Sequence, residues 1–76
     1  MVDKKPIILG EYIVMDPKIC HGKITFKGTR VFVSDILDQV ASGMTPGDIV
    51  KDWDGVSKEA ISEAVQLDSE GVFEEN

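Results

Sequence analysis

The sequence predicts a mostly α-helical domain with a small N-terminal β-hairpin. Two observations predict this class. An alternating apolar and polar segment from Gly22 to Val33 surrounds a Lys27-Gly28 pair, which is typical of a hairpin. After it, three apolar segments with helical spacing each follow a residue that caps helices well. No Pro-, Gly- or Ser-rich linker interrupts the 76 residues.

We therefore expect a single domain over the whole chain, 1–76. Its expected parts are a β-hairpin region (12–33), a three-helix region (34–70) and an acidic tail (71–76).

The predicted hairpin turns at Lys27-Gly28, with glycine supplying the positive φ that such turns need. This register places Phe26 opposite Thr29 and Ile24 opposite Val31. One face then carries Ile24, Phe26, Val31 and Val33, and the other carries Thr25, Arg30 and Phe32. The β-branched and aromatic run 12–14, which ends at Asp16-Pro17, predicts a third strand.

Ser34 is the predicted N-cap of the first helix, which ends at Gly43. Its apolar stripe is Ile36, Leu37, Val40 and Ala41. Thr45 is the predicted cap of the second helix, with Pro46 at its first position and Asp48 completing a variant capping box. Its apolar side is Ile49, Val50 and Trp53.

A break at Asp54-Gly55 separates the second helix from a third, which Ser57 is expected to cap. The residues expected to face inward are Ile61, Ala64 and Val65, with Val72 or Phe73 closing the end. Three short helices joined by tight turns after a hairpin outline a trihelical (winged) helix-turn-helix-like bundle. The outward residues of the third helix include three acids, Glu59, Glu63 and Asp68, against Lys58, so the charge favours helix-turn-helix packing over DNA reading.

Charge is distributed unevenly along this chain of net charge −6. Residues 1–30 hold six Lys and Arg against three acids, whereas residues 31–76 hold two against eleven. Nucleic acid attracts cationic surfaces, so contacts with it are expected mainly from the first part. The candidate nucleic-acid-binding residues are Lys23, Lys27, Arg30 and Lys58. For Arg30 a structural role, solvating or bracing the hairpin, is favoured over clamping a DNA phosphate or a partner carboxylate.

Candidate partner-binding residues lie toward the end of the chain: Trp53, Asp68, Glu70, Val72 and Phe73. Trp53 is either a core anchor, which we favour, or an exposed hot spot. The segment from Asp68 onward, with Glu74 and Glu75, either binds a partner as an induced helix or is a solvated tail.

The sequence predicts a protein that is not an enzyme. Cys20-His21 is the one pair that suggests a metal or a nucleophile, but neighbours on an extended segment point apart and no further ligands converge. We expect no catalytic residue, metal or cofactor. A single cysteine and no apolar run long enough to span a bilayer favour the cytoplasm. So small a core favours a homodimer. The hairpin region is either a wing or the seam of that dimer, and the seam is favoured because the strand at 12–14 leaves an edge that another copy can pair with.

One series of motifs extends through residues 12–68: Asp16-Pro17, Ile19, Gly22, Lys27-Gly28-Thr29-Arg30, Ser34-Asp35-Ile36-Leu37, Gly43 and Thr45-Pro46-Gly47-Asp48-Ile49. With these motifs the chain resembles the small prokaryotic family catalogued as domain of unknown function 433. Where many members have proline after Gly-Lys, this chain has Ile24. The resemblance implies a winged or trihelical helix-turn-helix fold. It also implies an antitoxin of a type II toxin-antitoxin pair, whose toxin is a ribonuclease of PIN-like fold.

Two functions of different classes remain open. The first is a non-enzymatic antitoxin-like protein that neutralises a PIN-like ribonuclease, with autoregulation of its operon as an added expectation. The second is a stand-alone helix-turn-helix transcriptional regulator that binds operator DNA. A purely structural dimer is a third, weaker alternative. The neighbouring gene and salt-dependent DNA binding would discriminate between them.

Overall fold

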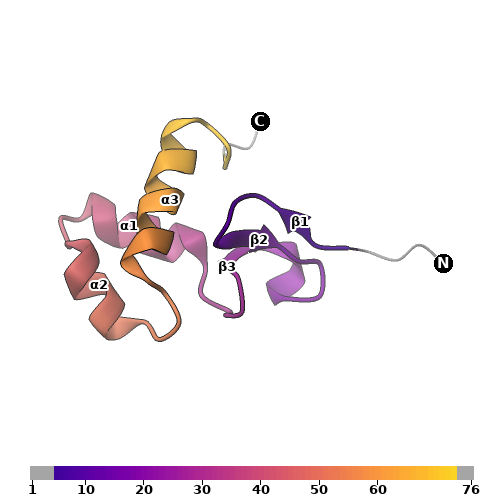
Figure 1. The fold of residues 1–76 in the computed structure, drawn as a ribbon, viewed down its shortest axis with the longest axis horizontal. Coiled ribbons are helices and arrows are strands. Elements are labelled where there is room, and N and C mark those ends of the chain that lie inside the picture. Colours follow the sequence, from indigo (N-terminus) through magenta and orange to yellow (C-terminus); the bar gives the residue numbers. More distant parts are fainter. Residues whose placement is uncertain (1–4, 74–76) are drawn as a thin grey trace.

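The structure, a computed structural model, describes residues 5–73 and divides them into a small sheet and three helices (Figure 1). The elements, in chain order, are β1 (Ile7–Ile8), β2 (Ile13–Met15), a 3₁₀ turn η1 (Cys20–Gly22), β3 (Ile24–Phe26), α1 (Val33–Ala41), α2 (Pro46–Asp52) and α3 (Lys58–Ser69). In Figure 1 the sheet lies on the right and α1 and α2 on the left. Helix α3 contacts α1, α2 and β2, so it joins the two parts.

The sheet is antiparallel, with the order β1-β2-β3. In β2 and β3, Ile13 pairs with Phe26 and both side chains are buried in the core. Residues 12–14 were expected to add a strand beside the hairpin, and β2 confirms this strand by pairing with β3. Strand β2 is also the central strand of the sheet, because its other side pairs with β1, which was not predicted.

The turn at Lys27-Gly28 is confirmed, because the Thr29 N–H donates to Phe26 O at 3.0 Å and Gly28 has φ +77°. The expected hairpin register is wrong. Residues 31–33 form no strand, and a single bridge joins Thr25 to Phe32. The Thr29 hydroxyl donates to Phe26 O at 2.9 Å and accepts from the Val31 N–H at 3.0 Å. These local bonds compete with a regular ladder and shift the returning chain.

The expected division of the hairpin into a core face and a mixed face is also wrong at Thr25. Thr25 and Phe26 are both fully buried, and adjacent strand residues point to opposite faces, so both faces of β3 are covered. Helix α1 contacts β3 and contributes to this cover. Thr25 Oγ1 has no hydrogen-bond partner among the described residues.

Helix α1 begins two residues earlier than expected. Its N-cap is Phe32, which makes no side-chain cap bond, so the prediction of Ser34 as the cap is wrong. Val33 is only 2% exposed, and its burial against the core places the first helical residue there. Gly43 follows the helix with φ +101°, as expected of a terminating glycine.

The caps of α2 and α3 are confirmed. Thr45 Oγ1 accepts from the Asp48 N–H at 3.2 Å, and Ser57 Oγ accepts from the Ala60 N–H at 3.1 Å. Each bond satisfies one of the amides that a helix start leaves free. Between the helices, Gly55 has φ +86°, which explains the chain break predicted at that glycine.

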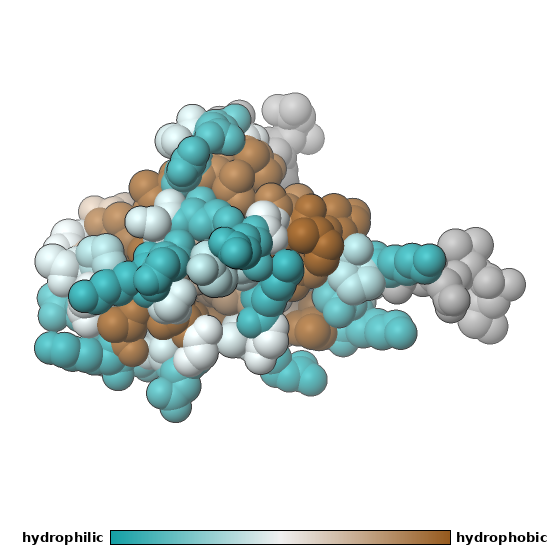
Figure 2. Space-filling model, viewed as in Figure 1, coloured by the Kyte–Doolittle hydropathy of each residue, from teal (hydrophilic) through white to brown (hydrophobic). Residues whose placement is uncertain are grey.

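The core gathers residues from the sheet and from all three helices: Ile13, Phe26, Val33, Ile36, Ile49, Val56, Ala60, Ile61 and Ala64. Val65 was expected to face inward but is 41% exposed, because it lies a further 100° around α3 from Ala64. Phe73 packs against the core, whereas Val72 is exposed. Figure 2 shows a mostly hydrophilic face with hydrophobic surface over β1. No helix within residues 5–73 is long and apolar enough to cross a membrane.

Candidate functional site

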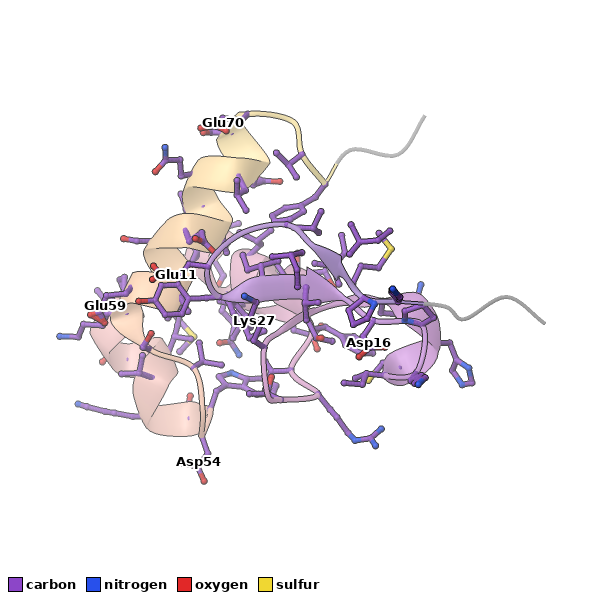
Figure 3. All side chains as sticks on the ribbon, turned by 45° about the vertical axis from the view of Figure 1, so that its right-hand side comes forward. Glu11, Asp16, Lys27, Asp54, Glu59 and Glu70 are labelled. Carbon is purple, nitrogen blue, oxygen red and sulfur yellow. The ribbon has the colours of Figure 1, made fainter. Side chains whose placement is uncertain are left out.

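An acidic hollow of about 550 Å³ lies between the start of α3 and the turn that joins β1 to β2. It is lined by Glu11, Tyr12, Lys58, Glu59, Ser62, Glu63 and Gln66. Figure 3 shows Glu11 and Glu59 on the same side of the molecule. Three carboxylates against one ammonium make this hollow suited to a cationic group of a partner.

The Glu63 carboxylate holds the β1–β2 turn against α3. Its Oε2 accepts from the Glu11 N–H at 2.9 Å, and its Oε1 accepts from the Tyr12 N–H at 2.8 Å. A side chain at Gly10 would prevent this, because its Cβ would lie 2.6 Å from Glu63 Cδ. Both oxygens of Glu63 thus accept hydrogen bonds from the backbone of the turn. Glu11 and Glu59 are then the carboxylates of this hollow that are free to contact a partner.

Tyr12 reports the negative potential of the hollow. The Glu11 carboxylate raises the pKa of the Tyr12 phenol above its ordinary value of 10.0, and desolvation, Glu59 and Glu63 add to the effect. A negative field disfavours the phenolate, so Tyr12 remains a neutral hydroxyl that can donate or accept a hydrogen bond.

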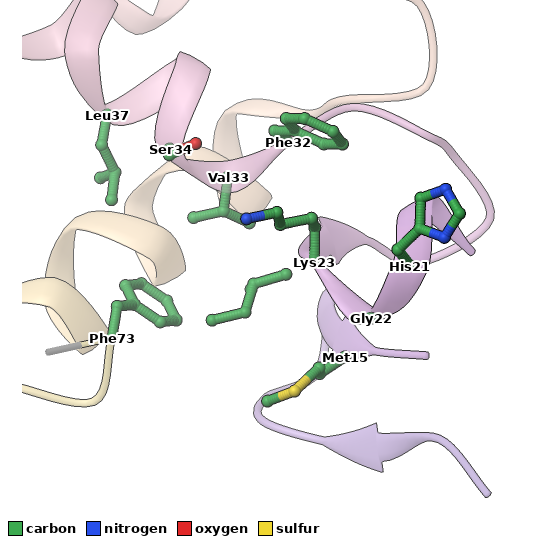
Figure 4. Close-up of a pocket in the computed structure, with 10 residues that line it drawn as sticks. Met15, His21, Gly22, Lys23, Phe32, Val33, Ser34, Leu37 and Phe73 are labelled. Carbon is green, nitrogen blue, oxygen red and sulfur yellow. The ribbon is translucent and has the colours of Figure 1, made fainter. Parts of the chain in front are cut away.

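A second hollow, of about 380 Å³, is mostly apolar and lies between the sheet, the start of α1 and the chain after α3 (Figure 4). It is lined by Met15, His21, Gly22, Lys23, Ile24, Phe32, Val33, Ser34, Leu37 and Phe73. In Figure 4 the Lys23 side chain extends over the hollow toward the start of α1. The structure thus brings together Lys23, a predicted nucleic-acid contact, and Phe73, a predicted partner contact.

The four predicted nucleic-acid contacts do not form one cluster. Lys23 and Lys27 flank the two ends of β3, and Arg30 follows in the next loop; all three side chains are exposed. Lys58 instead begins α3 and lines the acidic hollow. Only its charge linked Lys58 to the hairpin cations in the sequence, and the fold separates it from them.

The predicted partner-binding residues divide into exposed and packed sets. Asp68, Glu70 and Val72 are exposed at the end of α3 and just after it. Trp53 packs against the core, as favoured, and its Nε1 donates to Gln39 Oε1 of α1 at 3.1 Å. Phe73 is half-buried. Residues 74–76 of the predicted acidic tail lie outside the described part of the chain.

Cys20 and His21 lie in the turn η1 and not on an extended segment. The expectation that they point apart as neighbours on an extended segment therefore rested on the wrong local structure. Both have positive φ, 51° and 58°. Cys20 is a free thiol whose Sγ lies 3.9 Å from Arg30 O. Across residues 5–73, no three or more His, Cys, Asp or Glu side chains are placed to hold a metal ion.

The link between Glu63 and the β1–β2 turn was not predicted from the sequence. Gly10-Glu11 after the apolar run 7–9 was a turn signal that could have located the turn. Nothing in the sequence pairs that turn with Glu63, because a partner more than fifty residues away leaves no local pattern.

The chain is thus a small domain in which a short antiparallel sheet packs on three helices, with one acidic and one mostly apolar hollow at its surface. More particularly, the chain belongs to the family described as Protein of unknown function (DUF433), which matches residues 13–66. This confirms the resemblance noted in the sequence.

A crystal structure of Rv2018 from Mycobacterium tuberculosis is similar to this fold, with a TM-score of 0.62 and 30% sequence identity. The similarity covers 70% of this chain but 24% of the Rv2018 chain, so the shared domain is a minor part of that protein. A search among curated proteins found no match.

Proposed function

We propose that this protein is a non-enzymatic antitoxin-like protein that binds and neutralises a ribonuclease of PIN-like fold. The family resemblance supplies the class of partner. The observation that carries the proposal is the acidity of the solvent-exposed positions of α3 and its C-cap, where Glu59, Asp68 and Glu70 are exposed. A ribonuclease cleft attracts the phosphates of RNA with basic side chains, and a negative surface is complementary to those side chains.

The same surface argues against α3 as a DNA-reading helix. Helices α2 and α3, joined by residues 53–57, have the order of a helix-turn-helix, in which the second helix enters the major groove. Phosphates on both sides of the groove would repel exposed acids on that helix. The helix-turn-helix is therefore proposed as a packing unit whose outer face meets protein.

The test first asks whether the gene next to this one encodes a ribonuclease of PIN-like fold, and then measures whether this chain inhibits that ribonuclease. RNA cleavage and association rate are measured with the native chain and with a triple variant, Glu59→Gln, Asp68→Asn and Glu70→Gln. We expect inhibition by the native chain and an association rate about 5- to 50-fold lower for the variant at low salt.

The matched control removes the same charge from α1, α2 and the following turn: Asp38→Asn, Asp52→Asn and Asp54→Asn, all at exposed positions. Figure 3 shows Asp54 far from Glu70. Equal slowing by the control and the triple variant would mean that net charge, and not this surface, governs binding. A native chain that neither binds nor inhibits the ribonuclease would refute the proposal.

A second candidate function, operator DNA binding, is favoured by the exposed cations around β3, Lys23, Lys27 and Arg30. A stand-alone regulator binds the upstream DNA without a protein partner and weakens steeply as salt rises. Binding isotherms at two salt concentrations, with the chain alone and with the ribonuclease added, distinguish this role from autoregulation by the complex.

A further inference from the structure

Strand β1 presents an apolar, open edge of the sheet. It is the end strand in the order β1-β2-β3, and its other side faces no strand of residues 5–73. Ile7 and Ile8 are 53% and 61% exposed, among the most exposed large apolar side chains described. Hydrophobic surface lies over β1 in Figure 2. Such an edge is a template for pairing with another strand.

The backbone of Ile8 points toward this open edge. The Leu9 N–H donates to Ile13 O of β2 at 3.0 Å, and Ile7 lies opposite Met15. In an antiparallel ladder the N–H and C=O of successive residues point alternately to the two sides. The N–H and C=O of Ile8, between Ile7 and Leu9, therefore point away from β2.

We propose that β1 pairs antiparallel with β1 of a second copy, about a two-fold axis that passes between the two Ile8 residues. Each Ile8 then exchanges two N–H···O=C bonds with its counterpart, and each Ile7 lies beside Leu9 of the other copy. The two three-stranded sheets become one sheet of six strands. The symmetric arrangement buries the same apolar edge in both copies.

Charge complementarity supports a second copy as the occupant in this register. The exposed Lys5 precedes β1, and the exposed Glu11 lies in the turn that follows it. Antiparallel pairing centred on Ile8 brings Lys5 of each copy to the turn that carries Glu11 of the other, which gives two opposite-charge pairs. A shift of the axis to Ile7 would move Lys5 beside Leu9 and lose both pairs.

Cysteine cross-linking tests the register. In a Cys20→Ser background, Ile8→Cys places two thiols opposite each other in a hydrogen-bonded pair with a Cα separation of about 5.5 Å, which a disulfide can bridge. The matched control is Ile7→Cys, which is similarly exposed but displaced by two residues from its symmetry mate. We expect rapid covalent dimers from Ile8→Cys under mild oxidation and little from Ile7→Cys. Equal rates for the two variants would overturn the proposed register.

A charge swap tests the pairing without a cross-link, with the dissociation constant measured by sedimentation equilibrium. Lys5→Glu or Glu11→Lys alone should weaken dimerisation about 5- to 30-fold, and the double variant should recover it. Lys51→Glu on α2 is the control. A chain that is monomeric at millimolar concentration, or a double variant that dimerises no better than the single ones, would overturn the proposal. Neither result bears on ribonuclease binding, which the dimer does not require.

Discussion

Replacement of Glu63 by alanine is expected to lower the free energy of unfolding by about 2 to 3 kcal/mol. One carboxylate holds two backbone amides in the native state. The bond from the part-buried Tyr12 amide is charge-assisted and contributes about 1.5 to 2 kcal/mol. The bond from the exposed Glu11 amide contributes about 0.5 to 1 kcal/mol, because water replaces the lost acceptor there.

Glu63→Gln should lose about half as much, since its single carbonyl oxygen still accepts one of the two bonds. Glu59→Gln is the matched control on the same helix. It removes an equal charge near the N-terminus of α3, and its expected cost is about 0.3 to 0.5 kcal/mol from the helix dipole alone.

A double-mutant cycle with Gly10 isolates the contact. In the native chain, Gly10→Ala should cost about 1 to 3 kcal/mol, because its Cβ would meet the Glu63 carboxylate. In the Glu63→Ala background that carboxylate is absent and the same change should cost nothing or stabilise slightly.

Urea unfolding followed by the fluorescence of Trp53, the single tryptophan, measures all of these changes. Additive effects of Gly10→Ala and Glu63→Ala would refute the reasoning, as would a Glu63→Ala variant no less stable than Glu59→Gln.

Three further predictions follow from single residues. Tyr12 is the one tyrosine, so its phenolate absorbance should titrate above pH 10. Because the pKa of Tyr12 is raised in the folded state, its contribution to stability is present below pH 10 and is lost as the pH rises through the folded pKa. The Tyr12→Phe variant should not show this loss of stability. Thr25→Val, which removes an unpartnered buried hydroxyl while keeping its shape, should stabilise by about 1 kcal/mol in the same urea assay, and destabilisation would mean that the hydroxyl has a partner. Ile61→Ala should cost about 2 to 5 kcal/mol and Val65→Ala under about 1, and equal costs would contradict their difference in burial.

Features set by neighbours along the chain were predictable from the sequence. The caps Thr45 and Ser57 and the turn glycines Gly28 and Gly55 act within a few residues, so their chemistry is visible in a short window. The prediction of Ser34 as the N-cap of α1 was wrong because the burial of Val33 determined where α1 begins, and burial depends on the whole fold.

Features set by distant neighbours were not predictable. The partner of β3 proved to be β2, because the local bonds of Thr29 divert the chain after the turn. Strand β1 is two residues long and leaves almost no periodic signal. In the candidate site, the exposure of the hairpin cations was anticipated, whereas the acidic hollow depends on α3 packing beside the β1–β2 turn.

The bonds from Glu63 to Glu11 and Tyr12 span 52 and 51 positions of the chain, which has a consequence for biosynthesis. A ribosome releases the strands long before it releases α3. Until then the turn after β1 lacks the acceptor that fixes it, and the nascent sheet is incompletely anchored. Growing chains on one messenger would therefore acquire a rigid β1 only after α3 has left the ribosome, which would delay the proposed pairing of β1 strands until the helices have formed.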